Sequence, residues 1–464
     1  MIGMIRWCAL VLCASCLLLL VACAEQVSAP PPAAPLPTVA PTTPAPAVAT
    51  SAAAGPTPTE AVPPLPTPTP LPMGTLTNEL TAYLQTQVPL APAEPDAIGT
   101  GITSVRAISI ENTIDDRPLW LAYSLGKVNP VSDTYHFVAL YTYHPAAPQP
   151  WQELERESLE TVEVLDDWSG INQAWVVPER IWIEVKGGVG AHSGVYVLLS
   201  FDGTSLRREV TATHSSPAGA GRLHDINGDD TPEVLINQTD DYVYCYACGI
   251  REVSYSFMRW NGTTMEPVAL APLSATMPPD LANLNNEAIA HAEVGLWKDA
   301  HHLAQQAAAL NATTGNPTVR LNVGIITTIA EGRAAAMLPN TLLPYVFYGD
   351  YAAATAYMAG HPVEALFLPP DQNPLIVGTP AEGWAAAMLA RIQSETLPAL
   401  IFRPDLAGAY FVRGWAGYLQ NPESVQARAD LQQAAVLSPT ETLFLQSVAY
   451  LNIGSRQCQC YCRA

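Results

Sequence analysis

The sequence predicts a multidomain protein in which a disordered proline-rich linker precedes an antiparallel all-β domain and then an all-α helical-repeat domain. Three observations indicate this order. Sixteen of the 43 prolines fall within Ala24–Met73, a segment too poor in large apolar residues to form a core. Apolar residues then alternate with period two up to about position 270, as in strands. From about Pro279, alanine-rich segments take the spacing of helices.

The first segment, Met1–Ala22, has the features of an export signal. Arg6 supplies a positive charge, and the apolar run Trp7–Ala22 is short for a membrane span but suits a signal core. The run ends in Leu-Val-Ala before Cys23, which resembles the bacterial lipobox. The resemblance implies cleavage before Cys23, lipidation of its sulfur and anchoring at the extracytoplasmic face of a bacterial membrane. A generic cleaved signal with an incidental cysteine is the alternative.

Residues 23–73 form the predicted stalk. This segment is rich in proline, threonine and alanine, and Glu25 and Glu60 are its only charged residues. Proline holds the chain in extended polyproline II without internal hydrogen bonds. We therefore expect a disordered spacer that lifts the folded part away from the membrane.

Residues 74–274 form the predicted β domain, after a short helix near Thr77–Gln87. Its strand patterns are β-branched or aromatic runs bounded by turn residues. Two similar hairpins, turning at Asp202-Gly203 and Asn261-Gly262, lie 59 residues apart and favour type I′ turns. That spacing suggests four-stranded blades of a partial propeller, although a sandwich gives the same local pattern. The predicted strands are Val105–Ile110, Leu119–Tyr123, Tyr135–Tyr143, Ile181–Lys186 and Val195–Phe201.

One segment of the β domain, Asp225–Glu233, carries a pattern of oxygen ligands. Side-chain oxygens recur at Asp225, Asn227, Asp229 and Glu233, and a main-chain carbonyl is expected at Thr231. Ca²⁺ prefers six to eight oxygen ligands, and a tight loop of alternating ligands supplies most of them. The pattern therefore predicts a structural calcium site. An acidic turn without metal is the alternative.

This loop resembles the calcium loops of integrin-α-type repeats, the FG-GAP and VCBS families, in which Asp-x-Asn-x-Asp precedes a strand. The resemblance covers about residues 190–270 and implies that Asp225, Asn227, Asp229, Thr231 and Glu233 hold the ion. The family often has glycine where this chain has Asp230. We therefore expect Asp230 to make the bend in the left-handed region, which aspartate tolerates.

Five cysteines lie beyond the signal and the lipobox. In an exported protein a local disulfide between Cys245 and Cys248 is the expected state, and a redox site is a weaker alternative. Cys458, Cys460 and Cys462 stand in a short tail, residues 456–464, where we expect free thiols. A zinc site formed across the two clusters is a further, less favoured arrangement.

Residues 275–455 form the predicted helical domain, interrupted by a proline-rich stretch, Leu368–Pro380. Small residues recur there at matching offsets, which resembles tetratricopeptide repeats. The resemblance implies paired helices, a concave groove and a peptide or protein partner. A generic alanine-rich bundle is the alternative. The three copies are Gly295 with Ala300 and Ala307, Gly360 with Ala365, and Gly414 with Ala427, Ala434 and Pro439.

Taken together, these features predict a non-enzymatic, lipid-anchored scaffold that binds an unidentified protein through its helical repeats. A formal net charge of −21, with only three lysines, argues against nucleic acid as a main partner. The alternative is a glycan-binding or glycan-processing module in the β domain. Its candidate sugar platforms are Trp168, Trp175, Trp182 and Trp260, although burial in the core is the commoner fate of such rings.

Overall fold

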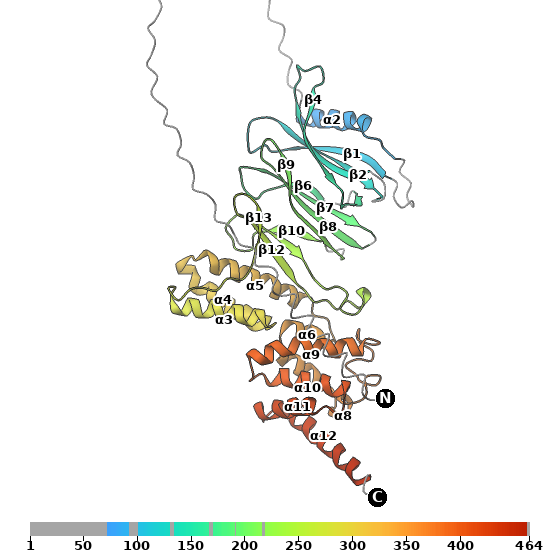
Figure 1. Cartoon of the computed structure of the whole chain (residues 1–464), viewed down its shortest axis with the longest axis vertical. Coiled ribbons are helices and arrows are strands. Elements are labelled where there is room, and N and C mark those ends of the chain that lie inside the picture. The colour runs from blue at the N-terminus through green and yellow to red at the C-terminus, as the bar shows by residue number, and fades with distance from the viewer. Residues whose placement is uncertain are drawn as a thin grey trace, which may run out of the picture. The chain divides into compact units, whose positions relative to one another are not determined.

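The computed structural model (Figure 1) describes residues 72–91, 101–129, 134–166, 170–190, 192–215 and 219–461, with side chains up to Asn452. An antiparallel β domain is followed by a C-terminal helical domain, which confirms the predicted fold class. The export signal, the lipobox cysteine Cys23 and the stalk up to Leu71 lie outside the described residues, so those expectations stay predictions.

The β domain consists of two antiparallel sheets, and their strand order is simple. The nine-stranded sheet contains β1 Gly101–Ile110, β2 Leu119–Lys127, β3 His136–Tyr143, β4 Trp151–Leu159, β5 Val164–Leu165, β6 Gly170–Ala174, β7 Ile181–Val189, β8 Ser193–Phe201 and β9 Leu206–His214. The four-stranded sheet contains β10 Gly221–His224, β11 Glu233–Asn237, β12 Tyr255–Trp260 and β13 Met265–Val268.

Three four-stranded meanders make up these sheets. Each strand pairs with its neighbour in sequence within β1–β4, within β6–β9 and within β10–β13. The short strand β5 pairs with both β2 and β7 and so joins the first two meanders into one sheet. The two similar hairpins of the sequence are β8–β9 and β12–β13, which occupy the same place in the second and third meanders.

The nine-stranded sheet curls so that its two meanders face one another. One buried cluster contains Leu121 and Leu140 of the first meander together with Ile183 and Val197 of the second. The outer strands β4 and β9 approach each other, since Arg208 of β9 forms an ion pair of 2.7 Å with Glu157 of β4. Arg208 also donates to the Ser158 carbonyl at 2.6 Å. The result is a half-barrel, visible in Figure 1.

Alternating side chains give each meander a second buried face. Helix α2 (Met73–Gln87) covers the outer face of the first meander, where Leu80 packs near Trp120. Trp182 of the second meander and Trp260 of the third share a cluster between those two sheets. The far face of the third meander, through Phe257, packs on helix α5 of the helical domain. The β layers are thus covered by a helix at each end.

The two hairpin turns differ from the expected type I′. Outside glycine, positive φ angles among the described residues occur only at Asp230 and Asn340, so Asp202 and Asn261 do not have them. Instead, the Asp202 carboxylate accepts hydrogen bonds from the main-chain N–H groups of Thr204 and Ser205. The Asn261 side-chain oxygen likewise accepts from the main-chain N–H groups of Thr263 and Thr264. Side-chain capping of this kind replaces the left-handed first residue of the expected turn.

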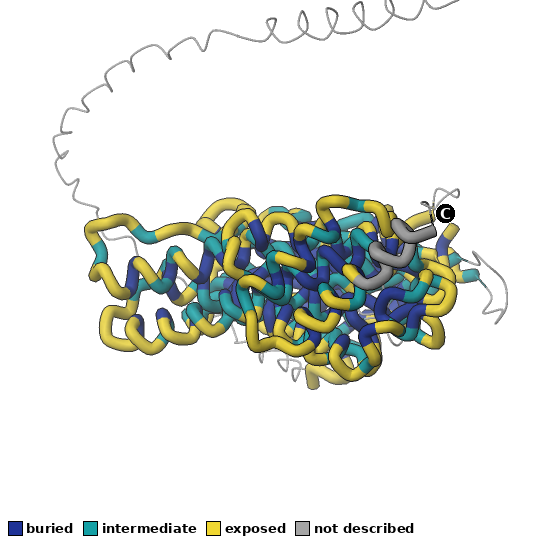
Figure 2. Tube along the Cα trace, turned by 90° about the horizontal axis from the view of Figure 1, so that it is seen from below, coloured by how far each residue is buried: buried dark blue, intermediate teal, exposed yellow. Residues whose placement is uncertain are grey.

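Ten helices follow the β strands in the described chain. They are α3 Pro279–Glu293, α4 Trp297–Thr314, α5 Pro317–Ala335, α6 Leu343–Tyr348, α7 Tyr351–Met358, α8 Val363–Leu366, α9 Ala385–Phe402, α10 Ala407–Gln420, α11 Val425–Leu437 and α12 Thr442–Tyr461. Buried positions line the sides of these helices that face one another, and exposed positions lie on the outside (Figure 2). No helix among the residues described is long and apolar enough to span a membrane.

Two of the three small-residue copies form helix pairs. Gly295 turns the chain between α3 and α4, with Ala300 and Ala307 buried. In α10, a Cβ at Gly414 would lie 2.9 Å from the Ala427 carbonyl oxygen, so this glycine lets α10 and α11 approach closely.

The copy at Gly360 is not such a pair, because its second helix, α8, has only four residues. Four prolines between positions 369 and 380 restrict helical continuation there.

Candidate functional site

The helical domain contains a groove of about 720 Å³ between α9, α10 and α11. Side-chain amides are the most frequent polar groups on its walls. The lining residues include Gln393, Ser394 and Leu397 of α9, Arg413 and Gln420 of α10, and Gln426 of α11.

A hydrogen-bond network holds two of these amides, Gln393 and Gln426, in place. Arg413 donates to both carboxylate oxygens of Asp430, each at 2.8 Å, and both side chains are largely buried. Gln426 donates to the same carboxylate at 2.8 Å, and Gln393 donates to the Arg413 carbonyl at 2.7 Å. Because Asp430 neutralises Arg413, the groove presents amide dipoles without an unpaired formal charge.

A proline interrupts the main-chain hydrogen bonding of α9, the helix that forms one wall of the groove. Pro398 has no N–H and cannot bond the carbonyl of Ser394, four residues earlier in the helix. Ser394 lines the groove. Its carbonyl therefore lacks the usual helical donor.

An apolar ridge runs along α9 beside the groove. We define the α9 ridge as Leu397, Ile401 and Phe402, whose side chains are 49%, 75% and 38% exposed. Leu397 and Ile401 stand four residues apart and so share one helix face. His291 of α3 packs edge-on against the Phe402 ring, with the ring centres 5.0 Å apart. Adjacent exposed apolar side chains of this size are typical of protein-binding surfaces.

In the β domain, the predicted calcium loop is held together by Asp225. Its carboxylate accepts hydrogen bonds from the main-chain N–H groups of Asn227, Gly228, Asp229 and Asp230. Burial opposes ionisation of this carboxyl, but the four donors outweigh burial and lower the pKa of Asp225. Asp230 has a φ of 63°, so the expected left-handed bend at this residue is confirmed.

Glu233, at the end of the loop, is fully buried and is contacted by Asn227 and Arg259. Asn227 donates to Glu233 at 2.7 Å. Arg259 of β12 lies 3.4 Å from Glu233 and forms an ion pair with Asp229. Burial raises the pKa of Glu233, although Ile226 N–H and Arg259 act in the opposite direction.

These contacts bear on whether the loop fits a calcium ion. Arg259 brings a positive charge to two of the three carboxylates that would bind the cation, so a bound ion and the Arg259 contacts exclude each other. Among the described side chains, no group of three His, Cys, Asp or Glu is arranged to hold a metal. The spacing of the loop ligands could not reveal Arg259 as part of this site, because Arg259 lies on another strand, 26 residues after Glu233.

The same loop also contacts the helical domain. A pocket of about 410 Å³ lies between the loop and helices α4 and α5. Its polar lining includes Asp225 and Asn227 on one side and Asn311, Arg320 and Glu331 on the other. The loop is therefore part of the packing between the third meander and the helices.

A second connection to the helices is the segment between β11 and β12, which contains the predicted cysteine pair. Cys245 and Cys248 form a disulfide, with their Cα atoms 5.2 Å apart. On either side of it, Tyr244 and Ile250 are buried within the core of the helical domain. Tyr244 stacks on Trp384 with ring centres 6.4 Å apart. The disulfide thus lies in a loop that anchors the β domain to the helices, a role that its sequence position between strand patterns does not reveal.

Charged side chains surround this anchor. Arg391 of α9 contacts Asp240 at 3.0 Å and Glu252 at 3.4 Å, and Arg333 of α5 lies 3.6 Å from Glu252. Burial lowers the pKa of Arg333, while Glu252 and Glu395 oppose that shift. Burial and then the nearby Glu252 charge raise the pKa of Glu395.

The tryptophans proposed as sugar platforms lie in different surroundings. Trp182 is fully buried and meets Trp260 edge to face, with ring centres 5.1 Å apart. Trp260 is 9% exposed and Trp175 is 52% exposed. Trp168 lies outside the described residues. Trp182 and Trp260 are therefore not exposed sugar platforms, because the layered packing of the second and third meanders places them in the core, the commoner fate for such rings.

Comparison with known proteins gave no matching family model, no similar curated protein and no similar solved structure.

Proposed function

We propose that this chain is a non-enzymatic scaffold, lipid-anchored through Cys23 at the extracytoplasmic face of a bacterial membrane, which binds a segment of another protein through its helical domain. The observation that carries the proposal is the amide-lined groove between α9, α10 and α11 beside the exposed α9 ridge. The small-residue pattern that resembles tetratricopeptide repeats supports the same type of partner.

The groove chemistry favours an extended, uncharged peptide segment with apolar side chains. Gln393, Gln420 and Gln426 each offer a donor and an acceptor, as the main chain of an extended peptide requires. The α9 ridge would take the apolar side chains of the partner, and this burial would supply most of the binding free energy.

The test is capture of proteins from a bacterial envelope extract by the full chain, with and without charges on the α9 ridge. We expect Leu397→Glu combined with Ile401→Glu to abolish capture of the partner. The matched control is Val436→Glu on α11, since Val436 is 71% exposed and does not line the groove. Equal capture by the unaltered chain, the double variant and the Val436→Glu control would contradict the proposal.

We also propose that the Asp225–Glu233 loop binds calcium as a structural ion. The ligand spacing, the left-handed bend at Asp230 and the buried carboxylate of Glu233 support this. When bound, calcium would contribute charge neutralisation to the loop carboxylates. Asp225, Asp229 and Glu233 would hold it with Asn227 and the Thr231 carbonyl, after Arg259 has moved away from the two carboxylates that it contacts.

A further inference from the structure

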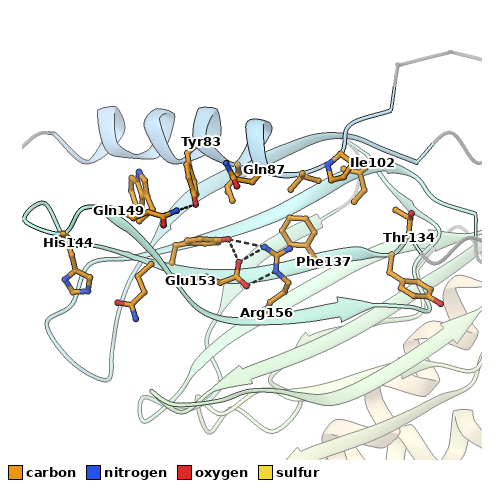
Figure 3. Close-up of a pocket in the computed structure, with 17 residues that line it drawn as sticks. Tyr83, Gln87, Ile102, Thr134, Phe137, His144, Gln149, Glu153 and Arg156 are labelled. Carbon is orange, nitrogen blue, oxygen red and sulfur yellow. Dashed lines mark hydrogen bonds and ion pairs between the residues drawn. The ribbon is translucent and has the colours of Figure 1, made fainter.

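A pocket of the β domain lies between α2 and the first meander, and the function proposed above does not use it. Its volume is about 870 Å³, within the usual range for sites that bind small molecules. Figure 3 shows side chains from α2 above and from the sheet below pointing into the same space. The pocket shares no lining residue with the groove of the helical domain.

Aromatic rings form much of the pocket wall, contributed by Tyr83, Tyr135, Phe137, Tyr141 and Trp151. Trp151 is held edge-on by Trp120, with ring centres 5.0 Å apart. Tyr83 of α2 accepts a hydrogen bond of 2.5 Å from Gln149 on the opposite side (Figure 3). Tyr135 also lines the pocket and is 36% exposed. The wall thus combines rings held by neighbouring side chains with an accessible ring at Tyr135.

The charged groups of the pocket neutralise one another. Arg156 binds Glu153 through two hydrogen bonds of 2.9 and 2.5 Å, and its guanidinium lies 4.1 Å from the centre of the Phe137 ring. Tyr141 donates its hydroxyl to Glu153. The Arg156 contact lowers the pKa of Glu153. A charged ligand therefore finds no unpaired opposite charge among the described lining residues.

The other polar groups are amides, hydroxyls and an imidazole, contributed by Gln87, Gln149, Gln152, Thr134 and His144. Such groups both donate and accept hydrogen bonds. A proline-rich peptide, which also docks on aromatic grooves, offers mainly carbonyl acceptors. A sugar ring instead has an apolar C–H face that stacks on an aromatic ring and hydroxyls that donate and accept around its rim. The lining matches the sugar more closely.

We propose that this pocket binds a neutral oligosaccharide, with Tyr83 and Tyr135 as stacking platforms and the Glu153–Arg156 pair as a combined acceptor and donor for hydroxyls. The proposal concerns binding only. It relocates the carbohydrate site from the tryptophans that the sequence indicates to rings on α2 and β3–β4 and on the loop leading into β3.

The test is titration of the full chain with neutral hexasaccharides of glucose, N-acetylglucosamine and mannose, followed by calorimetry and tryptophan fluorescence. We expect at least one to bind with a Kd on the order of 10 μM to 1 mM. Tyr83→Ala and Tyr135→Ala should each weaken binding about tenfold. Trp175→Ala, which removes an exposed ring outside the pocket, should leave the affinity unchanged.

Three results would overturn the proposal: binding of none of the hexasaccharides, binding that survives both tyrosine substitutions, or binding of a proline-rich peptide in their place. Tyr135 is exposed, so its substitution leaves the core intact, and unchanged far-ultraviolet circular dichroism verifies this. Capture of a protein by the helical groove should be the same in Tyr83→Ala as in the parent chain, so the two proposals fail independently.

Discussion

The main chain of Ile226 lies directly against Gly324, where the Asp225–Glu233 loop meets helix α5. A Cβ at position 324 would come 1.9 Å from the Ile226 carbonyl oxygen and 2.7 Å from its carbonyl carbon. Both neighbours are main-chain atoms, which cannot move aside as a flexible side chain can. The packing of the β domain on α5 therefore depends on the absence of a side chain at one helical position.

We expect Gly324→Ala to lower the free energy of unfolding by about 2 kcal/mol or more. The loss comes from forced separation of the loop and α5, and it exceeds the gain of about 1 kcal/mol that alanine normally brings to a helix. Urea unfolding measures it. The control is Gly74→Ala in α2, where a Cβ meets no atom within 4 Å, and it should be neutral or stabilising. A neutral Gly324→Ala would mean that the loop does not pack on α5 in solution.

Calcium binding should be opposed by Arg259. We expect calcium to raise the melting temperature of the parent chain and to raise it further in Arg259→Gln, because the positive charge beside Asp229 and Glu233 is removed. Saturation at about one hundred times Kd would stabilise the protein by about 2.7 kcal/mol. Asp225→Ala should abolish the shift. A melting temperature that calcium and chelator leave unchanged in the parent chain and in Arg259→Gln would remove the site.

The two carboxyls of the loop should respond to pH with opposite signs. Burial raises the pKa of Glu233. Its contribution to folding stability is therefore fully present below its unfolded pKa and is lost as pH rises through its higher folded pKa. The pKa of Asp225 is lowered, so this carboxylate stabilises the folded state at pH values above its unfolded pKa. That stabilisation is lost as pH falls through its lower folded pKa.

Relative to the parent chain, Glu233→Gln should therefore become more stable as pH rises, and Asp225→Asn less stable. Melting temperatures of the three proteins between pH 3 and 8 test this prediction. Trends of the same sign in both variants would contradict it.

The disulfide should stabilise the loop that anchors the β domain to the helices. Replacing Cys245 and Cys248 by serine frees a short loop, which corresponds to about 2 kcal/mol of chain entropy in the unfolded state. We expect the free energy of unfolding, measured with urea, to fall by this amount in the double-serine variant. Adding reductant to the parent chain should lower it by the same amount. Reductant should not change the stability of the double-serine variant. If it does, the stabilising cysteines lie elsewhere.

Local patterns predicted the type of each domain but not how the parts pack. The period-two runs located β1, β2, β3, β7 and β8, whereas polar strands such as β4, Trp151–Leu159, have no such run. The stacking of three meanders depends on pairs such as Trp182 with Trp260, which lie far apart in sequence. These two rings are buried, the commoner of the two fates that the sequence allowed for them, because each strand of an inner sheet has two buried faces.

The candidate sites show the same limit. The Asp225–Glu233 pattern could be found because its residues are contiguous, while Arg259 and Gly324, which complete its surroundings, come from other elements. The groove residues Gln393, Arg413 and Gln426 lie on three helices and form no sequence motif. The proline inside α9 was the one local signal that could have drawn attention to this face.

The central claim, that the groove binds a protein segment, is tested most directly by site-specific photocrosslinking. One variant carries a photoreactive amino acid in place of Gln426, inside the groove. A second variant carries the same photoreactive amino acid in place of Val436, on the exposed surface of the same helix, and the two are compared in envelope preparations. We expect one discrete crosslinked partner from position 426, lost when Leu397 and Ile401 are replaced by glutamate, and none from position 436. Identical patterns from both positions would contradict the claim.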